Sequence, residues 1–456
     1  MNRPNRSAPP SDRRSFLKQV SAAGLGVGLT PAVLKGADDR KVSLGFIGVG
    51  GRGSNLLRLC LRFSDVSIPA VCDIAPDNLR RAQDRVQSSG RPRPEGYGED
   101  ENSYLELLQR DDLDGVVIAT PWELHIRMAI DSMKAGIYAG VEVGPANSIE
   151  ECWNLVETYE ETRVPCMLLE NNCYARYNMA ILRMVREGVF GELIHCQCGY
   201  AHDLRERLVL GKGTGPTPKG DGDYRSMHNQ YRNGELYPTH SIGPIAHCLN
   251  IQRGNRFEYL TSMATKSRGL RKWAQDNLPP GHPRRDIAWK QGDLVTTTIK
   301  CANEETVVIK FDTRLPRPNS FLYVVQGTKG VWMQDADSSS KNKSMIYLDG
   351  MEPRHRWQSF DRFQERYEHP LWKSYLAAGI RKGHGGTDFL ELRAFKECIK
   401  RKINTPIDVY DMAAWMAISP LSEQSIRRSS APVDFPEFTQ GKWMSNPPLF
   451  GFTEAY

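Results

Sequence analysis

The chain of 456 residues lacks several features that mark other classes of protein. Beyond its N-terminus it has no run of about 18 apolar residues, which argues against a transmembrane helix and stable membrane insertion. Its ten cysteines include no C-x-x-C pair and no metal-ligand spacing, so we predict no metal site and interpret most of them as small buried side chains. Of the formal charge of +6, only +2 remains outside residues 1–40, which argues against a nucleic-acid partner.

Residues 1–40 predict an export signal. Paired arginines at 13–14 precede Phe-Leu-Lys at 16–18, and an uncharged, weakly apolar stretch follows at 19–34. Secretory signals share this order, but the paired arginines and weak hydrophobicity favour the twin-arginine type over a disordered basic tail. We therefore expect an exported protein of a bacterium, periplasmic or extracellular. The twin-arginine route carries folded proteins, and the cleavage point of the signal is left open.

The first stretch of the mature part, KVSLGFIGVGGRGSNLLRLC, predicts a buried strand, a glycine turn and a helix. Gly48 suits a tight turn, Gly50 lets the backbone approach a pyrophosphate, and Gly53 allows close packing of the helix. The helix N-terminus would offer free N–H groups to phosphates. A second strand ends at Asp73, where an acid can bind an adenosine ribose and favours NAD over NADP. We predict a dinucleotide site; a purely structural glycine turn is the alternative.

Strands and helices continue to alternate as far as residue 173. Strands are expected in DGVVIATPWELH, IYAGVEV and PCMLLENN, with helices between them. This alternation predicts a parallel, doubly wound sheet whose ligands bind at the carboxyl ends of the strands. Five polar or aromatic residues follow such ends and outline one rim of a crevice: Trp122, Glu123, His125, Glu142 and Asn171.

The second half, residues 174–456, predicts an α+β domain for substrate binding and oligomerisation. Alternating strands near GELIHCQCGYAHDLR, LVTTTIKC, ETVVIKFDT, FLYVVQGTKGVWMQ and KSMIYLD indicate a large, open, mainly antiparallel sheet. An exposed sheet face favours a homo-oligomer. Residues 210–244 are rich in glycine and polar residues, and a loop of that length is uncommon unless it is functional.

Two tyrosines and two histidines are candidates for proton transfer. Tyr200 and His202 are two residues apart at a predicted strand end, so both side chains face one side. Tyr237 and His240 follow the glycine-rich stretch. Tyrosine and histidine act as acids and bases near neutral pH once their surroundings shift them. A structural role in the core is the alternative for each histidine.

Several stretches resemble known families. GFIGVGGRGSNLL, ATPWELH and EVGPA resemble the Gfo/Idh/MocA superfamily. Within it, LENNCY, GELIHCQCGYAHDLR, NGELYPTHSIGPIAH, YEHPLWK, GHGGTDFLELRAFKECI, DVYDMAAWMAISPLSEQS and VDFPEFTQGKW resemble glycoside hydrolase family 109, the NAD-dependent α-N-acetylgalactosaminidases, over about residues 41–443. YPTH together with CGYAHDLR is specific to that branch, whereas the whole superfamily shares the glycine turn.

The resemblance implies roles for individual residues. It implies NAD contacts from Gly51, Arg52, Asp73, Trp122, Glu123, Leu124, His125, Glu142, Val143 and Asn171. It implies a glycan-binding pocket formed by Tyr200, Arg225, Tyr237, Pro238, Thr239 and His240, with His202 beside Tyr200. Asn319 stands where the family has the tyrosine of an Arg-Pro-Tyr-Ser turn, and it is too short to stack on a sugar ring. Tyr323, four residues on, is the nearest alternative.

The stretch GVEVGPANS lacks the lysine of the Glu-Lys-Pro motif that is usual in such chains, since Glu142 is followed by Val143 and Gly144. A dehydrogenase uses that lysine on an alcohol. The family's glycosidases instead oxidise C3 transiently, lose the C2 proton, expel the aglycone, add water and return the hydride, outside the two-carboxylate scheme. The missing lysine therefore favours the glycosidase. An exported sugar oxidoreductase using His240 and a non-catalytic nucleotide-binding protein are the alternatives.

Overall fold

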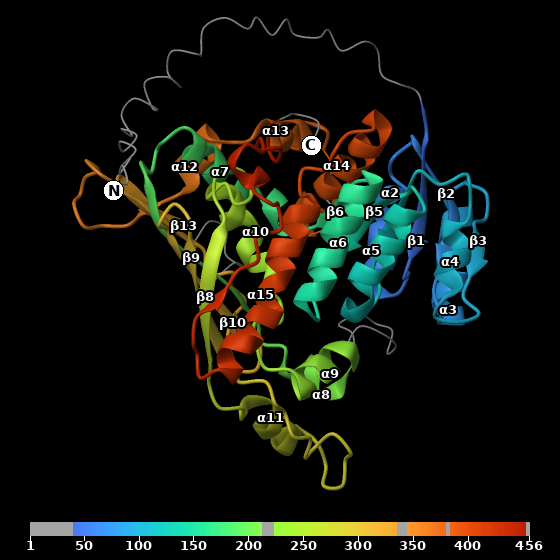
Figure 1. Cartoon of the computed structure of the whole chain (residues 1–456), viewed down its shortest axis with the longest axis horizontal. Coiled ribbons are helices and arrows are strands. Elements are labelled where there is room, and N and C mark those ends of the chain that lie inside the picture. The colour runs from blue at the N-terminus through green and yellow to red at the C-terminus, as the bar shows by residue number, and fades with distance from the viewer. Residues whose placement is uncertain (1–39, 212–222, 335–343, 380–383, 453–456) are drawn as a thin grey trace, which may run out of the picture. The chain divides into compact units, whose positions relative to one another are not determined.

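A parallel sheet of six strands, in the order β3-β2-β1-β4-β5-β6, forms the N-terminal part of the protein (Figure 1). The computed structural model describes residues 40–211, 223–334, 344–379 and 384–452, all within the compact unit Arg40–Tyr456. The predicted export signal, except for Arg40, lies outside the described residues.

Apart from the exposed edge strand β3, the strands of this sheet are nearly continuous apolar sequence, as expected where helices cover both faces. Its strands are β1 (Val42–Ile47), β2 (Val66–Cys72), β3 (Glu95–Tyr97), β4 (Gly115–Ile118), β5 (Tyr138–Glu142) and β6 (Cys166–Leu169). The helices between them are α2 (Gly51–Cys60), α3 (Pro76–Ser88), α4 (Ser103–Leu108), α5 (His125–Lys134) and α6 (Ile149–Thr162). The strand order reverses between β1 and β4, where a doubly wound sheet binds its ligand. The predicted Rossmann sheet is confirmed.

The second sheet has nine strands in the order β14-β13-β12-β11-β7-β10-β9-β8-β15. Its strands are β7 (Leu193–Ala201), β8 (Phe257–Ala264), β9 (Leu294–Cys301), β10 (Thr306–Asp312), β11 (Val324–Gly327), β12 (Gly330–Gln334), β13 (Ser344–Leu348), β14 (Gln358–Ser359) and β15 (Val433–Asp434). Among the described strands of this sheet only the neighbours β7 and β10 run parallel, so the predicted mainly antiparallel sheet is confirmed. β8 was not predicted, because Tyr259 and Met263 are exposed on it and interrupt the alternation of apolar and polar residues that indicates a strand.

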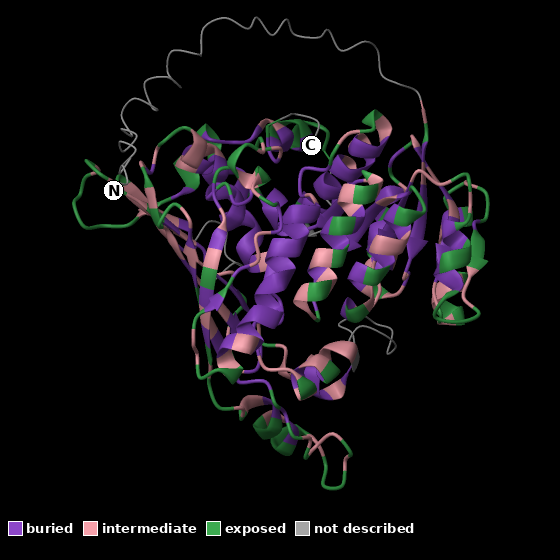
Figure 2. Ribbon diagram, viewed as in Figure 1, coloured by how far each residue is buried: buried purple, intermediate pink, exposed green. Residues whose placement is uncertain are grey.

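Helices fill the space between the two sheets. α7 (Arg176–Arg186) packs on α10 (Thr239–Cys248), and α10 packs on β7. α15 (Val409–Arg427) lies against α6 and β8, and Figure 2 shows it buried along most of its length. Its central stretch, residues 412–418, is apolar on all sides and buried, as expected of a helix enclosed by other elements.

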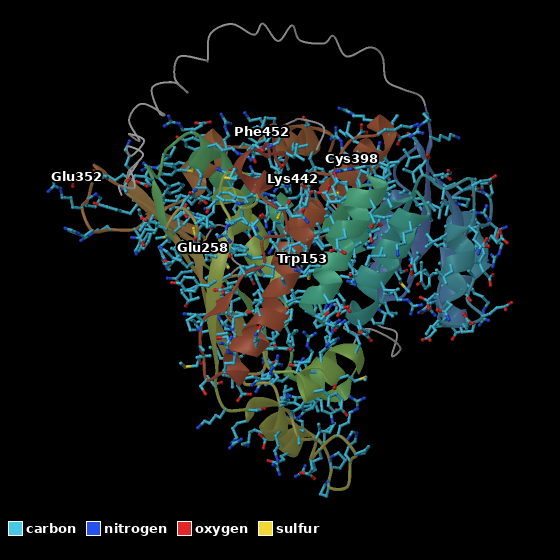
Figure 3. The ribbon with its side chains drawn as sticks, in the orientation of Figure 1. Trp153, Glu258, Glu352, Cys398, Lys442 and Phe452 are labelled. Atoms are coloured by element: carbon cyan, nitrogen blue, oxygen red, sulfur yellow. The ribbon has the colours of Figure 1, made fainter. Side chains whose placement is uncertain are left out.

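The remaining helices lie outside this layer or close it at one end. They are α8 (Arg205–Leu210), α9 (Asp223–Tyr231), α11 (Gly269–Asn277), α12 (Asp361–Arg366), α13 (Pro370–Ala377) and α14 (Thr387–Arg401). α14 returns to the N-terminal sheet, where its Phe395 lies so close to Gly140 that a Cβ on the glycine would be 2.9 Å from the ring. Trp153 of α6, labelled in Figure 3, packs on Phe438 at 4.8 Å.

The prediction of one long loop over residues 210–244 is wrong in part. Residues 212–222 lie outside the described residues, but α9 occupies 223–231 and α10 begins at Thr239. Polar residues predominate in α9, and its packing against α8 and against Trp122 replaces the apolar periodicity that would reveal a helix.

The cysteines behave as predicted, because all ten are free and buried. None of the helices in the described part of the chain is both long and apolar enough to span a bilayer.

Candidate active site

The glycine turn after β1 leaves no room for a side chain at Gly48 or Gly53. Gly48 has a φ of +81°, and a Cβ there would lie 2.7 Å from the carbonyl oxygen of Ala119. A Cβ on Gly53 would lie 1.9 Å from the oxygen of Gly48. α2 follows with Gly50 as its N-cap, with no side chain capping it and no acid in its first turn. Its first N–H groups are therefore available to an anion.

Asp73 follows β2 and turns its carboxylate toward this glycine turn. Its Oδ2 accepts the N–H of Val49 at 2.9 Å, and its Oδ1 accepts the N–H of Ala75 at 2.9 Å. The side chain of Asn78 donates to both oxygens at 3.2 Å. The cramped turn, the uncapped helix and this anchored carboxylate fit the pyrophosphate and ribose of a dinucleotide.

Arg52 lies at the centre of a buried ionic cluster. Its Nε donates to Glu142 Oε1 at 2.6 Å, its Nη1 to Asp388 at 3.0 Å and its Nη2 to Glu391 at 3.3 Å. The side chain of Asn171 donates to the other oxygen of Asp388 at 2.6 Å. Burial raises the pKa of the Glu142 and Glu391 carboxyls, while the charge of Arg52 opposes that rise.

Two members of this cluster, Asp388 and Glu391 of α14, were not predicted. They are three residues apart on a helix and both are buried, at 1% and 0% exposure. The sequence could have revealed them, because two acids at helical spacing inside the apolar stretch TDFLELRAF predict buried carboxylates that need a cationic partner.

Trp122 joins the dinucleotide rim to the second half of the chain. It begins a 3₁₀ turn (Trp122–Leu124) after β4, and its ring lies 5.2 Å from Tyr224 and 5.3 Å from Tyr237. A Cβ on Gly144 would lie 2.7 Å from the indole. The glycine in EVGP is therefore needed for Trp122 to take its position.

The other predicted rim residues support this corner. His125 begins α5, and its Nε2 donates to the carbonyl of Thr120 at 2.9 Å. Burial lowers the pKa of His125 to about 4, so the ring is neutral at pH 7. Glu123 accepts from His228 of α9 at 3.3 Å. Leu124 and Val143 pack in or against the core.

Arg225 of α9 is held between aromatic rings. Its guanidinium carbon lies 4.6 Å from the ring centre of Trp122 and 4.8 Å from that of Tyr237, and its Nε donates to the hydroxyl of Tyr224 at 3.2 Å. No carboxylate of the described chain pairs with it. Together with Trp122 and Tyr237 it lines a small pocket with Tyr200, Leu204, Leu208, Asn229, Phe311 and Thr313.

The four predicted proton-transfer residues meet beside this pocket. The ring of Tyr200 lies 4.5 Å from Tyr237, 4.8 Å from His202 and 5.9 Å from His240. The hydroxyl of Tyr237 lies 3.5 Å from His240 Nε2. Burial and the positive surroundings, His240 and Arg225 among them, lower the pKa of His202 to about 4. Burial raises the pKa of Tyr237, so its hydroxyl keeps its proton.

Pro244 shapes the turn of α10 that carries His240. Because proline has no N–H, the carbonyl of His240, four residues earlier, receives no helical hydrogen bond from it. That carbonyl accepts from the hydroxyl of Tyr323 at 2.6 Å and from the side chain of Asn172 at 3.1 Å. Tyr323 is thus fully buried beneath His240.

Glu170, which was not predicted, contacts the ring of His240 directly. It follows β6 and is 0% exposed, and its Oε1 lies 2.6 Å from His240 Nδ1. Its position in the sequence could have revealed it, because in LLENN it directly follows a buried strand and precedes the predicted Asn171.

The remaining predicted substrate residues lie at different depths. Thr239 is fully buried at the start of α10, directly after Pro238. Asn319 is exposed, while Phe321, which was not predicted, has its ring 6.2 Å from Tyr200 and 6.2 Å from His240. Two aromatic residues of this segment therefore lie beside His240: Phe321 at its ring and the buried Tyr323 at its carbonyl.

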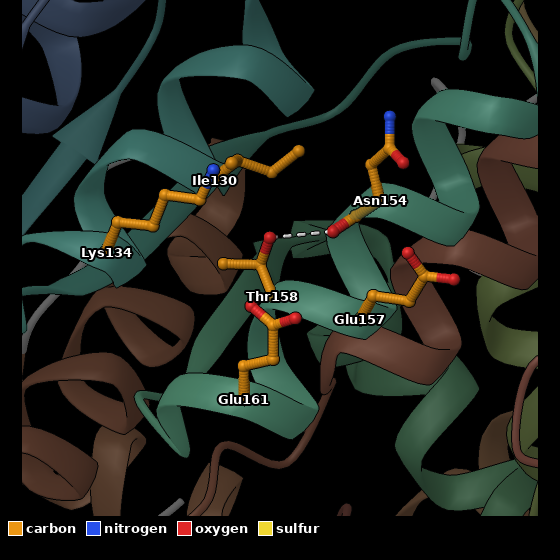
Figure 4. A pocket seen from close by; sticks show the side chains of 6 residues that line it. All are labelled: Ile130, Lys134, Asn154, Glu157, Thr158 and Glu161. Atoms are coloured by element: carbon orange, nitrogen blue, oxygen red, sulfur yellow. Dashed lines mark hydrogen bonds between the residues drawn. The ribbon is translucent and has the colours of Figure 1, made fainter.

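A second hollow lies between α5 and α6 (Figure 4). It is lined by Ile130, Lys134, Asn154, Glu157, Thr158 and Glu161. None of these belongs to the predicted site, and the Thr158 hydroxyl donates to the carbonyl of Asn154 within α6.

Comparison with known proteins identifies the class first. Residues 42–169 match the oxidoreductase family with an NAD-binding Rossmann fold. A solved levoglucosan dehydrogenase, in complex with NADH and levoglucosan, has the same fold with a TM-score of 0.65 and 18% identity, over 87% of this chain and 100% of that one. A glycine turn and Asp73 on one sheet, beside Tyr200 and His240 on the other half, define an NAD-dependent enzyme of the Gfo/Idh/MocA type.

The C-terminal half identifies the family. Residues 174–445 match the C-terminal domain of glycosyl hydrolase 109. The chain is 44% identical to a glycosyl hydrolase family 109 protein of Stenotrophomonas maltophilia, over 97% of this chain and 99% of that one. It is 42% identical to an alpha-N-acetylgalactosaminidase of Tannerella forsythia, over 96% and 99%. The chain belongs to glycoside hydrolase family 109 and is an NAD-dependent glycosidase.

Proposed function

We propose that the protein hydrolyses α-N-acetylgalactosaminides and that NAD stays bound between turnovers. The observation that carries the proposal is the meeting of Tyr200, Tyr237, His240 and Arg225 beside Trp122, at a dinucleotide rim that has Val143 in place of a lysine. The relative named alpha-N-acetylgalactosaminidase supports this choice of sugar.

The residues of the chain divide the work between holding the dinucleotide and moving protons. The glycine turn and Asp73 would hold the pyrophosphate and ribose, and Arg52, Glu142 and Asn171 would hold the nicotinamide end. When bound, NAD supplies reversible hydride transfer at a sugar carbon.

Proton transfer at the sugar C2 is the step that these residues would catalyse. With C3 as a ketone, loss of the C2 proton forms a C1–C2 double bond and expels the aglycone from C1. Water then adds at C1, and a proton returns to C2. His240 presents Nε2 toward this region, neutral His202 adds a second lone pair, and the hydroxyl of Tyr237 remains protonated as a donor.

An aryl α-N-acetylgalactosaminide tests this proposal on protein purified with its nucleotide. We expect many turnovers of aglycone release with no accumulation of NADH, and deuterium at C2 of the sugar when the reaction runs in D₂O. Tyr237→Phe should lower kcat by about 10²–10⁴-fold, the range for losing a positioned acid or base. Tyr231→Phe, at a tyrosine that is 62% exposed, is the matched control and should keep full activity.

Two results would contradict the proposal. An oxidised sugar formed together with NADH would identify a sugar oxidoreductase. Steady cleavage without deuterium at C2 would exclude the elimination route.

Export is part of the proposal. The paired arginines at 13–14 and the weakly apolar stretch after them support the twin-arginine route, which would place the enzyme in the periplasm or outside the cell. Ten buried free thiols suit a protein that folds before export and needs no disulfides.

A further inference from the structure

Glu170 approaches His240 as a hydrogen-bond acceptor. Its Oε1 lies 2.6 Å from Nδ1 and also accepts the backbone N–H of Asn172 at 3.0 Å. A carboxylate oxygen that accepts from a backbone amide has its lone pairs directed to donors, so the imidazole hydrogen belongs on Nδ1. Nε2 is then the unprotonated nitrogen of the neutral ring.

The free nitrogen of His240 faces the pocket. Nε2 lies 3.5 Å from the hydroxyl of Tyr237, which stays protonated because burial raises its pKa. Tyr237, His240 and Glu170 therefore form a chain in which each group donates to the next. The order, from pocket to interior, is hydroxyl, imidazole and carboxylate.

The fold makes room for this carboxylate. Gly243 of α10 packs directly against it, since a Cβ at 243 would lie 3.1 Å from the Cγ of Glu170 and 2.9 Å from the Sγ of Cys173. Glu170 has no arginine or lysine partner among the described residues, and its Oε2 has no hydrogen-bond partner there. The nearest group that can become a cation and pair with it is thus His240.

We propose that Glu170 is a positioning residue of the reaction, which orients His240 and fixes its Nδ1–H tautomer. It also stabilises the imidazolium that forms when Nε2 takes a proton from Tyr237 or from the sugar. In that step the O–H or C–H bond breaks, the N–H bond forms at Nε2, and Nδ1 keeps its hydrogen. The kinetic part of this proposal rests on the proposed function.

Glu170→Gln tests the kinetic part, with Glu368→Gln as the control. Glu368 is also a buried glutamate, at 5% exposure, but it pairs with Arg176 outside the site. On the aryl glycoside, E170Q should lower kcat by about 10²–10⁴-fold, as for other residues that orient a catalytic histidine, and leave KM within about threefold. NAD content and melting temperature should match those of E368Q. A kcat within threefold of wild type would overturn the proposal.

The tautomer of His240 tests the proposal without any substrate. In ¹⁵N-histidine-labelled protein, the signal lost in His240→Gln identifies the residue. At a pH where the ring is neutral, wild type should show a protonated Nδ1 and an unprotonated Nε2, and E170Q a mixture of both tautomers. A protonated Nε2 in wild type would overturn the proposal even if E170Q fails to fold. If the glycoside is not cleaved at all, the proposed function fails while this measurement still decides the orientation.

Discussion

Two prolines inside helices each leave a backbone carbonyl without its helical hydrogen bond, and that carbonyl accepts a hydrogen bond from another segment instead. Pro244 leaves the carbonyl of His240 to Tyr323 and Asn172. Pro420 does the same in α15, where the carbonyl of Met416 accepts the N–H of Ala146 at 3.2 Å. One carbonyl anchors the turn that carries His240, and the other ties α15 to the loop that follows Glu142.

Phe321 lies two residues after Asn319, the position where the family has a tyrosine, and we propose that its ring forms the aromatic wall of the sugar pocket. Its ring lies edge-on to His240, with 90° between the planes. Ser320, which lies between the two residues, pairs with Ala201 at the end of β7, so the segment is held beside Tyr200.

Phe321→Ala should therefore raise KM for α-N-acetylgalactosaminides. The lost aromatic contact is worth about 0.5–1.5 kcal/mol, which corresponds to about a 2- to 12-fold change, with kcat little affected. Asn319→Tyr in wild type should lower KM, and in the F321A background it should restore part of the loss. Steady-state kinetics would measure both, with Phe452→Ala, at a residue 57% exposed, as the control. An unchanged KM in F321A would place residue 321 outside the sugar pocket.

At the scale of elements, the turn after β6 connects both halves of the site. Its three consecutive residues point to different partners: Glu170 to the ring of His240, Asn171 to Asp388, and Asn172 to the carbonyl of His240. A single strand end therefore sets the distance between the dinucleotide rim and the proton-transfer residues.

The segment before α10 holds a second buried carboxyl. Glu235 is 0% exposed, and its Oε1 accepts the N–H of Tyr237 at 3.1 Å. Burial raises its pKa to about 8, against about 4.3 in an unfolded chain. Its contribution to stability is complete below the unfolded value and is lost as pH rises through about 8, because the unfolded chain ionises more readily.

Glu235→Gln should remove this pH dependence, since glutamine keeps the acceptor oxygen and does not titrate. The free energy of unfolding of E235Q relative to wild type should rise between pH 5 and pH 8.5, by at most about 1.4 kcal/mol per pH unit, and its melting temperature should rise with it. Differential scanning fluorimetry would follow it, with the partly exposed Glu258→Gln as the control. A difference that stays flat with pH would show that Glu235 is ionised in the folded protein.

At the scale of the whole molecule, the last quarter of the chain completes the dinucleotide site. α14 brings Asp388 and Glu391 to Arg52, two residues beyond the N-cap of α2. In the proposed NAD site, Arg52 would thereby couple nicotinamide binding to the packing of α14. NAD that binds only the folded protein should then stabilise both halves.

The purified protein should accordingly retain NAD. Denaturation should release it in near-stoichiometric amount, and the melting temperature should fall once it is removed. Asp73→Ala should weaken binding by about 1–3 kcal/mol, the loss of a charge-assisted hydrogen bond. Asp77→Ala, at an exposed acid of α3, is the control. Protein that purifies empty and turns over only with added NAD⁺, accumulating NADH, would count against retention.

Local pattern was sufficient for the fold class and for half of the site. Apolar runs that alternate with helices can only pack as a parallel sheet, and glycines at 48, 50 and 53 matter because of backbone space, which is a local property. The pairs at 200 and 202 and at 237 and 240 were also recognisable, since neighbours in sequence share a strand face or a helix turn. The domain boundary at 173 and the export signal stay predictions.

Contacts between distant segments were decided only by the tertiary structure. Glu170 meets His240 across 70 residues, Asp388 meets Arg52 across 336, and the ring of Phe321 approaches that of His240 across 81. No periodicity encodes such pairs, because each depends on how two elements pack and on which buried charge needs a partner. The sequence by itself determined the glycine turn and the paired tyrosines and histidines, whose spacing is local, and packing determined which distant carboxylates meet them.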